Sequence, residues 1–332
     1  MGRYAHPALA EREEIMLMRH EGRSQADIAR ATGRDRSTIS REMRRNSFRV
    51  GAGRCYRAST AQRSYEARRL SCVRPRILDD EGIAGLVTRL IVRERWSPEQ
   101  IVGRIGVERP DLSVSVSTIY RTVNDGRFDP PELERAKRGI RARLRHRGKR
   151  RHRRGGPEER CGRIPGARPI SERPAEVERC ARLGDWDGDT VVGRGACLVT
   201  LVDRMSGLLV GGRAATHTKR DVADVETAAL AGRPESRTAT LGRGKEFADF
   251  ARVEEATGAV FYFALPHHPW QRGTNENTNG LAREYFPKGT DFDAAGDERV
   301  REVYDAINHR PSKRHGFRTS CEVHHSQTLH LL

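Results

Sequence analysis

The sequence lacks three features that mark large classes of proteins. No apolar run approaches the roughly 20 residues that a membrane-spanning helix needs. Residues 1–16 contain no apolar segment of the kind found in secretory signals. The six cysteines form no CxxC pair, which argues against a structural zinc site and against a disulfide framework. We therefore expect a cytoplasmic protein with six reduced thiols.

Positive charge is what the sequence has in excess. Its 332 residues, enough for about two domains, include 62 Lys or Arg against 45 Asp or Glu. The net charge of +17 indicates a polyanionic partner such as nucleic acid. Residues 135–154 contain twelve Lys or Arg and no acidic residue. Such a block repels itself, so we expect it to stay out of a core and to lie along phosphates. A solvated linker without contacts is the alternative.

The N-terminal region reads as three short helices. Residues 11–20 place acidic residues first and basic residues last, and Ser24 can cap a second helix. A third helix is predicted for residues 35–45, with Ile39 and Met43 facing the core. Helices joined by a glycine-containing turn, the last one basic at its start, are typical of helix-turn-helix DNA binding. The residues expected to face DNA are Arg36, Ser37, Thr38, Ser40, Arg41 and Arg44. The alternative is a three-helix bundle with a charged face.

A second, similar module is predicted downstream. Ser97 can cap a helix that begins at Pro98, with Gln100 completing a capping box. Residues 115–123 resemble another short recognition helix. Its candidates for DNA contact are Thr118, Tyr120 and Arg121. The alternative is that this helix only contributes core residues.

After Pro174 the pattern becomes rich in short β-strands. The predicted strands are 185–192, 198–203, 207–210, 238–241 and 260–263, and the predicted helices are 218–231, 247–257, 276–285 and 297–308. Three strands followed by alternating helices and strands predict a mixed α/β sheet flanked by helices.

Acidic residues in this half point to metal-dependent chemistry. Alternation along a regular strand puts Asp185, Asp187 and Asp189 on one face. Carboxylates from a first strand, from the end of a later strand and from a helix can meet to hold two hard cations. Residues 266–291 add Glu276 among amides, aromatics and basic residues. Exposed turn acids and a solvated polar loop are the alternatives.

Five segments carry a family resemblance. They are GRDRSTISREMRRN at 33–46, WSPEQIVGRI at 96–105, STIYR at 117–121, GDWDGDTVVG at 184–193 and PWQRGTNENTNGLAREYFPKGTD at 269–291. With these segments the chain resembles, over nearly its whole length, the transposases of the insertion sequence 30 family. That family is a branch of the DDE transposases, which are related to retroviral integrases.

The resemblance implies a fold class and a set of site residues. The implied class is α+β, with an N-terminal all-α helix-turn-helix region followed by an α/β ribonuclease-H-like, integrase-type catalytic domain. Asp189 and Glu276 are implied as catalytic residues that bind two divalent cations, Mg²⁺ or Mn²⁺. Gly242 takes the place of the second catalytic aspartate, with 33 residues between it and Glu276 as in the family. Glu246 or Asp203 are the alternatives for supplying the missing ligand.

The resemblance also implies contacts to the DNA backbone. The residues implied to lie there are Arg272, Asn275, Asn277 and Lys288. His267 and His268 are either adjacent to the metal or have a structural or DNA-backbone role. The expected domains are a helix-turn-helix domain at 1–70, a second such module at 71–134, a basic linker at 135–174 and the catalytic domain at 175–332.

The implied function is DNA transposition. The protein would bind terminal inverted repeats in double-stranded DNA and perform metal-dependent strand cleavage and transfer, as a homo-oligomer on DNA at the bacterial nucleoid. Because glycine cannot bind a cation, Gly242 puts cleavage in question. The second hypothesis is therefore a catalytically decayed DNA-binding protein that represses a related element. A third, a structural RNA-binding protein, depends on the basic block alone.

Overall fold

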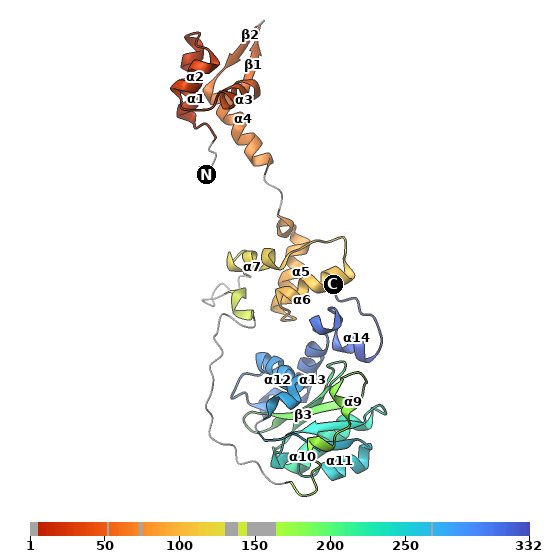
Figure 1. The fold of residues 1–332 in the computed structure, drawn as a ribbon. Helices are drawn as coiled ribbons and strands as arrows, with labels where there is room; N and C mark the ends of the chain where they lie inside the picture. Colours follow the sequence, from red (N-terminus) through yellow and green to blue (C-terminus); the bar gives the residue numbers. More distant parts are fainter. Residues whose placement is uncertain (1–5, 52, 73–75, 130–138, 145–163, 267) are drawn as a thin grey trace. The chain divides into compact units, whose positions relative to one another are not determined.

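The computed structural model describes residues 6–51, 53–72, 76–129, 139–144, 164–266 and 268–332 (Figure 1). The chain divides into two compact units, residues 1–79 and 80–332, and each is described by itself. Among the described residues, no helix combines the length and apolar character needed to cross a membrane. The five cysteines in these ranges are all free, while Cys161 lies outside them.

The first unit is a small helical domain with a β-hairpin. Its elements are α1 (Leu9–His20), α2 (Gln25–Ala31), α3 (Arg36–Asn46), β1 (Ser47–Val50), β2 (Gly53–Tyr56), α4 (Ala58–Ser71) and η1 (Ile77–Asp79). The three predicted helices are confirmed, and Ser24 caps α2 by accepting a hydrogen bond from the backbone of Asp27. Asp35 caps α3 in the same way. The hairpin and α4 were not predicted, because their segments show little apolar periodicity.

The core of this unit confirms the predicted inward residues, with one correction. Ile39 is fully buried and Met43 nearly so. The prediction that Thr38 faces outward is wrong, since only 8% of it is exposed. The buried stripe of α3 is wide enough to include Thr38 and Glu42 as well as the two apolar residues. Glu42 is tolerated there because it accepts a hydrogen bond from Arg12 Nε at 2.9 Å.

The second unit opens with a group of short helices. They are α5 (Glu81–Val92), α6 (Pro98–Glu108), α7 (Val116–Asn124) and the 3-10 helix η2 (Ile140–Arg143). The predicted capping box of Ser97 and Gln100 is confirmed, with Pro98 in the first position of α6. Ser115 caps α7, whose residues Ile119 and Val123 are core residues.

The basic block contributes to this helical group. Ile140 is fully buried, so the expectation that residues 135–154 stay out of a core is wrong at this residue. The flanking residues 130–138 and 145–163 lie outside the described part of the chain. A single isoleucine can anchor a charged segment because burying its side chain is worth about 1.5–3 kcal/mol.

The rest of the second unit is an α/β domain. Its strands are β3 (Asp185–Val192), β4 (Cys197–Asp203), β5 (Leu209–Ala214), β6 (Thr238–Leu241) and β7 (Val260–Phe263). They lie in the order β5-β4-β3-β6-β7, with β5, β4 and β3 antiparallel and β6 and β7 parallel to β3. Three antiparallel strands extended by two parallel ones form the ribonuclease-H-like sheet. The predicted fold class is confirmed.

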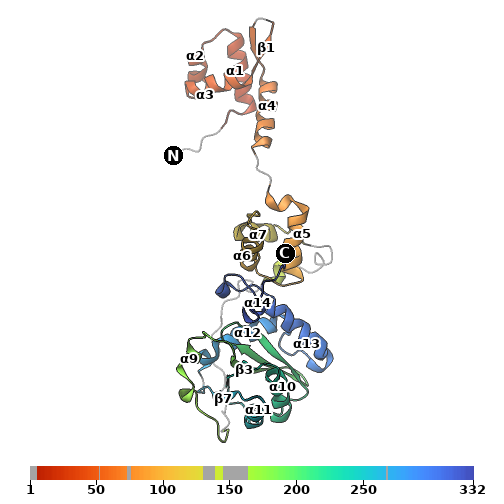
Figure 2. The same cartoon turned by 90° about the vertical axis from the view of Figure 1, so that its right-hand side faces the viewer.

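Helices cover both faces of this sheet (Figure 1 and Figure 2). The helical elements are η3 (Ile170–Glu172), α9 (Ala175–Glu178), α10 (Lys219–Ala231), η4 (Lys245–Phe247), α11 (Phe250–Thr257), η5 (Pro269–Arg272), α12 (Gly273–Tyr285), α13 (Phe292–Asn308), η6 (Lys313–His315) and α14 (Ser320–His324). One core cluster lies between the sheet and α10–α11, and another between the sheet and α12–α13. Helix α12 begins earlier than predicted because its first turn is polar and carries no apolar stripe. Helix α13 begins earlier because its first residues, from Phe292, precede a kink at the non-helical Gly296.

A buried ion-pair network ties α6 to the C-terminal segment. The Arg104 side chain is fully buried, and its Nη1 and Nη2 donate to the two carboxylate oxygens of Glu322 at 2.6 and 2.8 Å. Glu108 also accepts a hydrogen bond from Arg104. Bidentate geometry and full pairing are what make a buried ion pair tolerable. The helical group and the α/β domain are therefore joined by specific contacts.

Candidate functional site

The register of the sheet places Asp189 and Gly242 side by side. Strands β3 and β6 run parallel, with Asp187 paired to Thr240. Two residues further along each strand come Asp189 and Gly242, so the same register continued puts them next to each other. Residues two apart on a strand share a face. Gly242 therefore occupies the place from which a carboxylate would reach the space beside Asp189.

Arg272 fills part of that space. Its Nη1 lies 3.3 Å from Oδ1 of Asp189 and donates to the backbone carbonyl of Gly188 at 3.0 Å. A Cβ atom built on Gly242 would lie 3.1 Å from Nη2 and 3.3 Å from Cζ of this guanidinium. A positive charge thus lies between Asp189 and position 242. Because Arg272 is turned toward the sheet, only 21% of its side chain is exposed.

Two asparagines of α12 dock the helix against the strands at this point. Asn275 is fully buried and donates to the carbonyls of Asp187 at 2.8 Å and Thr200 at 3.1 Å. Asn279 donates to Oδ2 of Asp189 at 3.0 Å. The prediction that Asn275 lies near the DNA backbone is wrong, because its amide is used to hold α12 on β3 and β4. The sequence signal for this role was the spacing of four residues, which puts both amides on one helix face.

Glu276 lies between these two asparagines in the sequence but does not take part in the hydrogen bonds that dock α12. It is exposed, and among the described residues it forms no hydrogen bond or ion pair. The fold therefore brings β3, the end of β6 and α12 to one place, as the predicted site requires. It does not provide a direct contact between Asp189 and Glu276.

The two substitutes considered for the missing aspartate lie on the other face of the sheet. Asp203 pairs with Trp186 in the β3–β4 ladder, and its oxygens accept hydrogen bonds from the backbone of Gly184 and from Ser206. Oε1 of Glu246 lies 3.4 Å from Oγ1 of Thr190. Thr190 follows Asp189 on β3, so the Thr190 side chain points to the face opposite that of Asp189. Neither carboxylate is directed at the space beside Asp189.

The two other aspartates of β3 have structural partners. Asp187 is fully buried and accepts a hydrogen bond from Arg204 Nη1 at 2.7 Å. Burial raises the pKa of Asp187, against the lowering effect of the Arg204 charge. Asp185 accepts hydrogen bonds from Arg182 and Thr238. Of the three aspartates on this face, Asp185 and Asp187 are buried, whereas about one-third of the Asp189 side chain is exposed.

This donor set does not fit two divalent cations. Within the described ranges, no group of three or more His, Cys, Asp or Glu side chains is placed to hold a metal ion. One oxygen of Asp189 is held by Asn279, the other faces Arg272, and position 242 has no side chain. Hard cations need several oxygen ligands at about 2.0–2.6 Å, and a guanidinium in the same space repels them.

The candidate DNA-contacting side chains fall into two groups. Those fully on the surface are Arg36, Ser37, Ser40, Arg41, Arg44, Arg121 and Lys288. Thr118 is half-buried, and its hydroxyl lies 2.8 Å from the capping hydroxyl of Ser115. His268 contacts the carbonyl of Pro266 at 2.6 Å and its ring lies against Trp270, whereas His267 lies outside the described residues.

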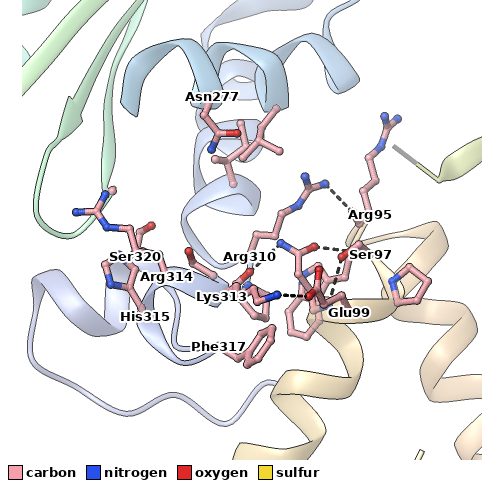
Figure 3. A pocket seen from close by; sticks show the side chains of 18 of the residues that line it. Arg95, Ser97, Glu99, Asn277, Arg310, Lys313, Arg314, His315, Phe317 and Ser320 are labelled. Carbon is pink, nitrogen blue, oxygen red and sulfur yellow. Dashed lines mark hydrogen bonds and ion pairs between the residues drawn. The ribbon is translucent and has the colours of Figure 1, made fainter. Parts of the chain in front are cut away.

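A basic cavity that sequence reasoning missed lies on another face of α12. It is lined by the start of α6, by α7, η2, α12 and the segment after α13 (Figure 3). Thr274 and Asn277 of α12 form one wall, so the cavity lies close to Glu276 on the same helix. No local motif could reveal it, because its residues are separated by more than 200 positions.

Comparisons with known proteins find one matching domain family and several similar proteins. The family described as a helix-turn-helix domain matches residues 3–46. The transposase for insertion sequence element IS1086 of Cupriavidus metallidurans is 37% identical over 318 residues, which cover 91% of this chain and 89% of the relative. The transposase for element IS4351 of Bacteroides fragilis is 34% identical, covering 96% and 94%. The transposase InsI for element IS30A of Escherichia coli is 34% identical, covering 96% and 83%.

Proposed function

The chain belongs to the insertion sequence 30 family of transposases, and we propose that it binds terminal inverted repeats but cleaves DNA poorly or not at all. In this proposal α3 and α7 contact double-stranded DNA. The proposed base and phosphate contacts are Arg36, Ser37, Ser40, Arg41, Arg44, Thr118, Arg121 and Lys288. Asp189 and Glu276 are the two remaining carboxylates of a DDE-type site.

The observation that carries this proposal is the space beside Asp189. The strand register puts Gly242 there, and the guanidinium of Arg272 lies within 3.3 Å of where its Cβ would be. Strand cleavage needs the charge on the attacked phosphate to be neutralised and the attacking oxygen to be activated. An arginine can neutralise charge, but it cannot activate water as a Lewis acid can.

The implied cofactor, Mg²⁺ or Mn²⁺, supplies that activation in transposases of this type. Because the residues present do not form its site, we assign no cleavage step to the native chain. The residues can still bind DNA, since the exposed cations of α3 and α7 are independent of Gly242. Arg272 neutralises Asp189, which lowers the repulsion that an unpaired carboxylate would exert on phosphates.

The wider features of the proposal follow from the family. We propose that the protein acts on DNA at the bacterial nucleoid, without a membrane partner, and assembles as a homo-oligomer on paired DNA ends. The four-part division at residues 70, 134 and 174 is proposed as the functional one, with two DNA-binding modules ahead of the catalytic domain. The alternative function is a repressor of a related element, and Gly242 is the observation that favours it.

The test is a cleavage assay on a duplex that carries the terminal inverted repeat bordering the gene. Native protein, Gly242→Asp and Gly242→Asn are compared with Mg²⁺ and with Mn²⁺. We expect all three to bind the duplex and only Gly242→Asp to cut it. Asn has nearly the same shape as Asp but no charge. Gly242→Asn therefore shows whether a gain in cleavage comes from a metal-binding carboxylate or only from filling the space with a side chain.

Each outcome has a distinct meaning. Cutting by the native chain would show that another ligand completes the site and would overturn the proposal. Binding without cutting by all three proteins would show that Gly242 is not what limits cleavage. Failure of all three to prefer the repeat over unrelated DNA would overturn the proposed DNA recognition itself.

A further inference from the structure

The cavity beside α12 has a volume of about 880 Å³, and Figure 3 shows the side chains that line it. Asn277 points into it from α12, and Phe317 lies toward its floor. Tyr120 and Asn124 of α7 form another part of its wall. Sites for small molecules and cofactors have volumes of roughly 300–1,000 Å³, so this cavity is of the size that binds a ligand.

The lining of the cavity is strongly basic. Five cationic side chains take part, with Glu99 as the only carboxylate among the lining residues. The cationic residues are Arg95, Arg141, Arg310, Lys313 and Arg314. Burial lowers the pKa of His315, and the charge of Arg314 lowers it further. Lys313 is paired with Glu99 at 2.8 Å and Arg310 with Glu284 at 3.1 Å, so the positive charge left to attract an anion includes that of Arg141 and Arg314.

Several of these cations are held in fixed positions by the protein. Arg310 donates to Glu284 at 3.1 Å and to the carbonyl of Arg95 at 2.6 Å. Arg314 donates to the carbonyl of Met205 at 2.9 Å, so its charge is oriented without being neutralised. A ligand that binds to such groups loses little affinity to the cost of ordering them.

Two lining residues have no role within the described structure. Tyr120 is 42% exposed although it is a large aromatic residue, and it forms no hydrogen bond with the described residues. Arg141 is exposed and forms no ion pair with them. An exposed aromatic ring and an arginine without an ion pair in the described part of the chain, both lining one cavity, are what a base and a phosphate require for stacking and for charge neutralisation.

Backbone strain marks the same place. Arg95 has φ of 56° and Phe317 has φ of 65°, in the left-handed region that residues other than glycine rarely adopt. Both line the cavity. Strained residues persist where the surrounding structure fixes them, and they gather at ligand sites. This observation is independent of the charge.

We infer that this cavity binds an unpaired nucleotide at the end of the DNA that the protein recognises. This inference rests on the proposed function, because the nucleotide belongs to the bound terminal repeat. The volume corresponds to a cube of roughly 10 Å, smaller than the 12 Å width of the B-DNA major groove alone, so a duplex cannot enter. An extruded base enters instead and stacks on Tyr120, while Arg141 and Arg314 face its phosphates.

The position of the cavity suits it to hold the DNA end in place. It lies between α7, which is proposed to contact the duplex, and α12, which carries Glu276. A nucleotide held there fixes how far the duplex end reaches along α12. The cavity is thus a positioning site for the DNA end, separate from the residues around Asp189.

Binding measurements on matched DNA ends test this inference. Fluorescently labelled terminal-repeat duplexes are prepared blunt, with a three-nucleotide 5′ extension and with a three-nucleotide 3′ extension. The ratio of the blunt Kd to the extended Kd is measured for native protein, Tyr120→Ala, Arg141→Ala and Arg220→Ala. Arg220 is an exposed arginine of α10, on the opposite face of the sheet, and serves as the control.

For native protein we expect the blunt Kd to be about ten times the extended Kd for one of the two extension polarities. A factor of this size is what the stacking of roughly one base contributes. The ratio should fall below about two in Tyr120→Ala and Arg141→Ala and stay unchanged in Arg220→Ala. A native ratio near one for both polarities overturns the inference, as does a ratio retained in both cavity variants. If the native protein does not bind the blunt terminal-repeat duplex at all, the proposed function is overturned instead.

Crosslinking locates the nucleotide directly. An extension that carries 5-iodo-deoxyuridine is irradiated in complex with the native protein, and crosslinked peptides are identified by mass spectrometry. We expect the peptide containing Tyr120. Crosslinks confined to peptides outside the cavity wall would overturn the inference even if the affinity ratio were high.

Discussion

The guanidinium of Arg272 lies against Asp189, with Nη1 and Oδ1 3.3 Å apart. These residues are 83 positions apart in the sequence, and the contact forms because Asn275 and Asn279 dock α12 onto β3. The charge of Asp189 is therefore balanced by a side chain of the protein. A cation from solution would have to share this space with an arginine, which costs electrostatic free energy.

Restoring the carboxylate should restore metal binding, which thermal unfolding can detect without any DNA. In Gly242→Asp the three atoms nearest to the new Cβ all belong to the end of the Arg272 side chain, which is flexible enough to move aside. We expect 10 mM Mg²⁺ to raise the Tm of Gly242→Asp by about 2–4 °C, because a ligand that binds the folded state stabilises it. Native protein and Gly242→Asn should show no such rise. An equal rise in all three would mean that the cation binds elsewhere.

The burial pattern of α3 predicts which of its residues recognise DNA. Arg41 is exposed and Thr38 is buried, although both belong to α3, the helix that we propose contacts DNA. Arg41→Ala should weaken binding to the terminal repeat about ten-fold or more, since it removes a base or phosphate contact. Thr38→Val should leave the Kd unchanged. Arg19→Ala, an exposed arginine on α1, is the matched control, measured by fluorescence anisotropy at one salt concentration.

Local patterns made much of the fold predictable. The caps at Ser24 and Ser97 depend only on residues within one helical turn, so sequence alone identifies them. The bounds of β3 were also predicted, because its alternation is regular. The position of Gly242 beside Asp189 followed from the family motif and agrees with the strand register.

Long-range contacts could not be predicted. The role of Arg272 depends on how α12 docks, and the buried state of Asn275 depends on which helix face meets the sheet. Periodicity marked Ile39 and Met43 as the core face of α3 but could not show that the face extends to Thr38. The burial of Ile140 could not be predicted because its neighbours in the sequence are basic. In each case a tertiary contact, not a local preference, decides the environment of the residue.

The buried Arg104 should be essential for stability. Replacing it with Ala leaves Glu322 and Glu108 buried without their cationic partner, and the loss of one member of a buried pair costs about 3–5 kcal/mol. Urea unfolding should show this loss for Arg104→Ala. The control is Arg109→Ala, which removes a fully exposed partner of Asp111 and should not measurably change stability. Equal effects of the two variants would contradict the assigned role of the network.

The same network predicts a loss of stability in acid. Burial by itself would raise the pKa of Glu322, but hydrogen bonds from Arg104 and from the backbone of Leu329 and Thr319 lower it to about 2. Because the folded-state pKa is below the ordinary value of 4.5, the stabilisation is complete above pH 4.5 and is lost as the pH falls toward 2. The Tm of Glu322→Gln should depend less on pH in this window than that of the native protein. Parallel curves would contradict this assignment.

Glu226 of α10 predicts an opposite dependence at higher pH. It is fully buried, its Oε1 has no hydrogen-bond partner within the described structure, and Glu246 repels its charge. Burial and this repulsion raise the pKa of Glu226 to about 8. Between pH 4.5 and 8 the folded state keeps a proton that the unfolded state has released, so stability falls as the pH rises through this window.

Glu226→Gln removes that proton without changing the shape of the side chain. From pH 5 to pH 8 the native protein should lose at least about 1.4 kcal/mol relative to Glu226→Gln, the value of one unit of pKa difference. Urea unfolding at pH 5, 6.5 and 8 measures this, and Glu255→Gln, on α11 and exposed, is the control. A constant difference between native and Glu226→Gln across the three pH values would show that Glu226 is ionised in the folded state. In that case the folded protein would have to supply a cationic or hydrogen-bonding partner for the Glu226 carboxylate, and that partner would come from the residues that face α10.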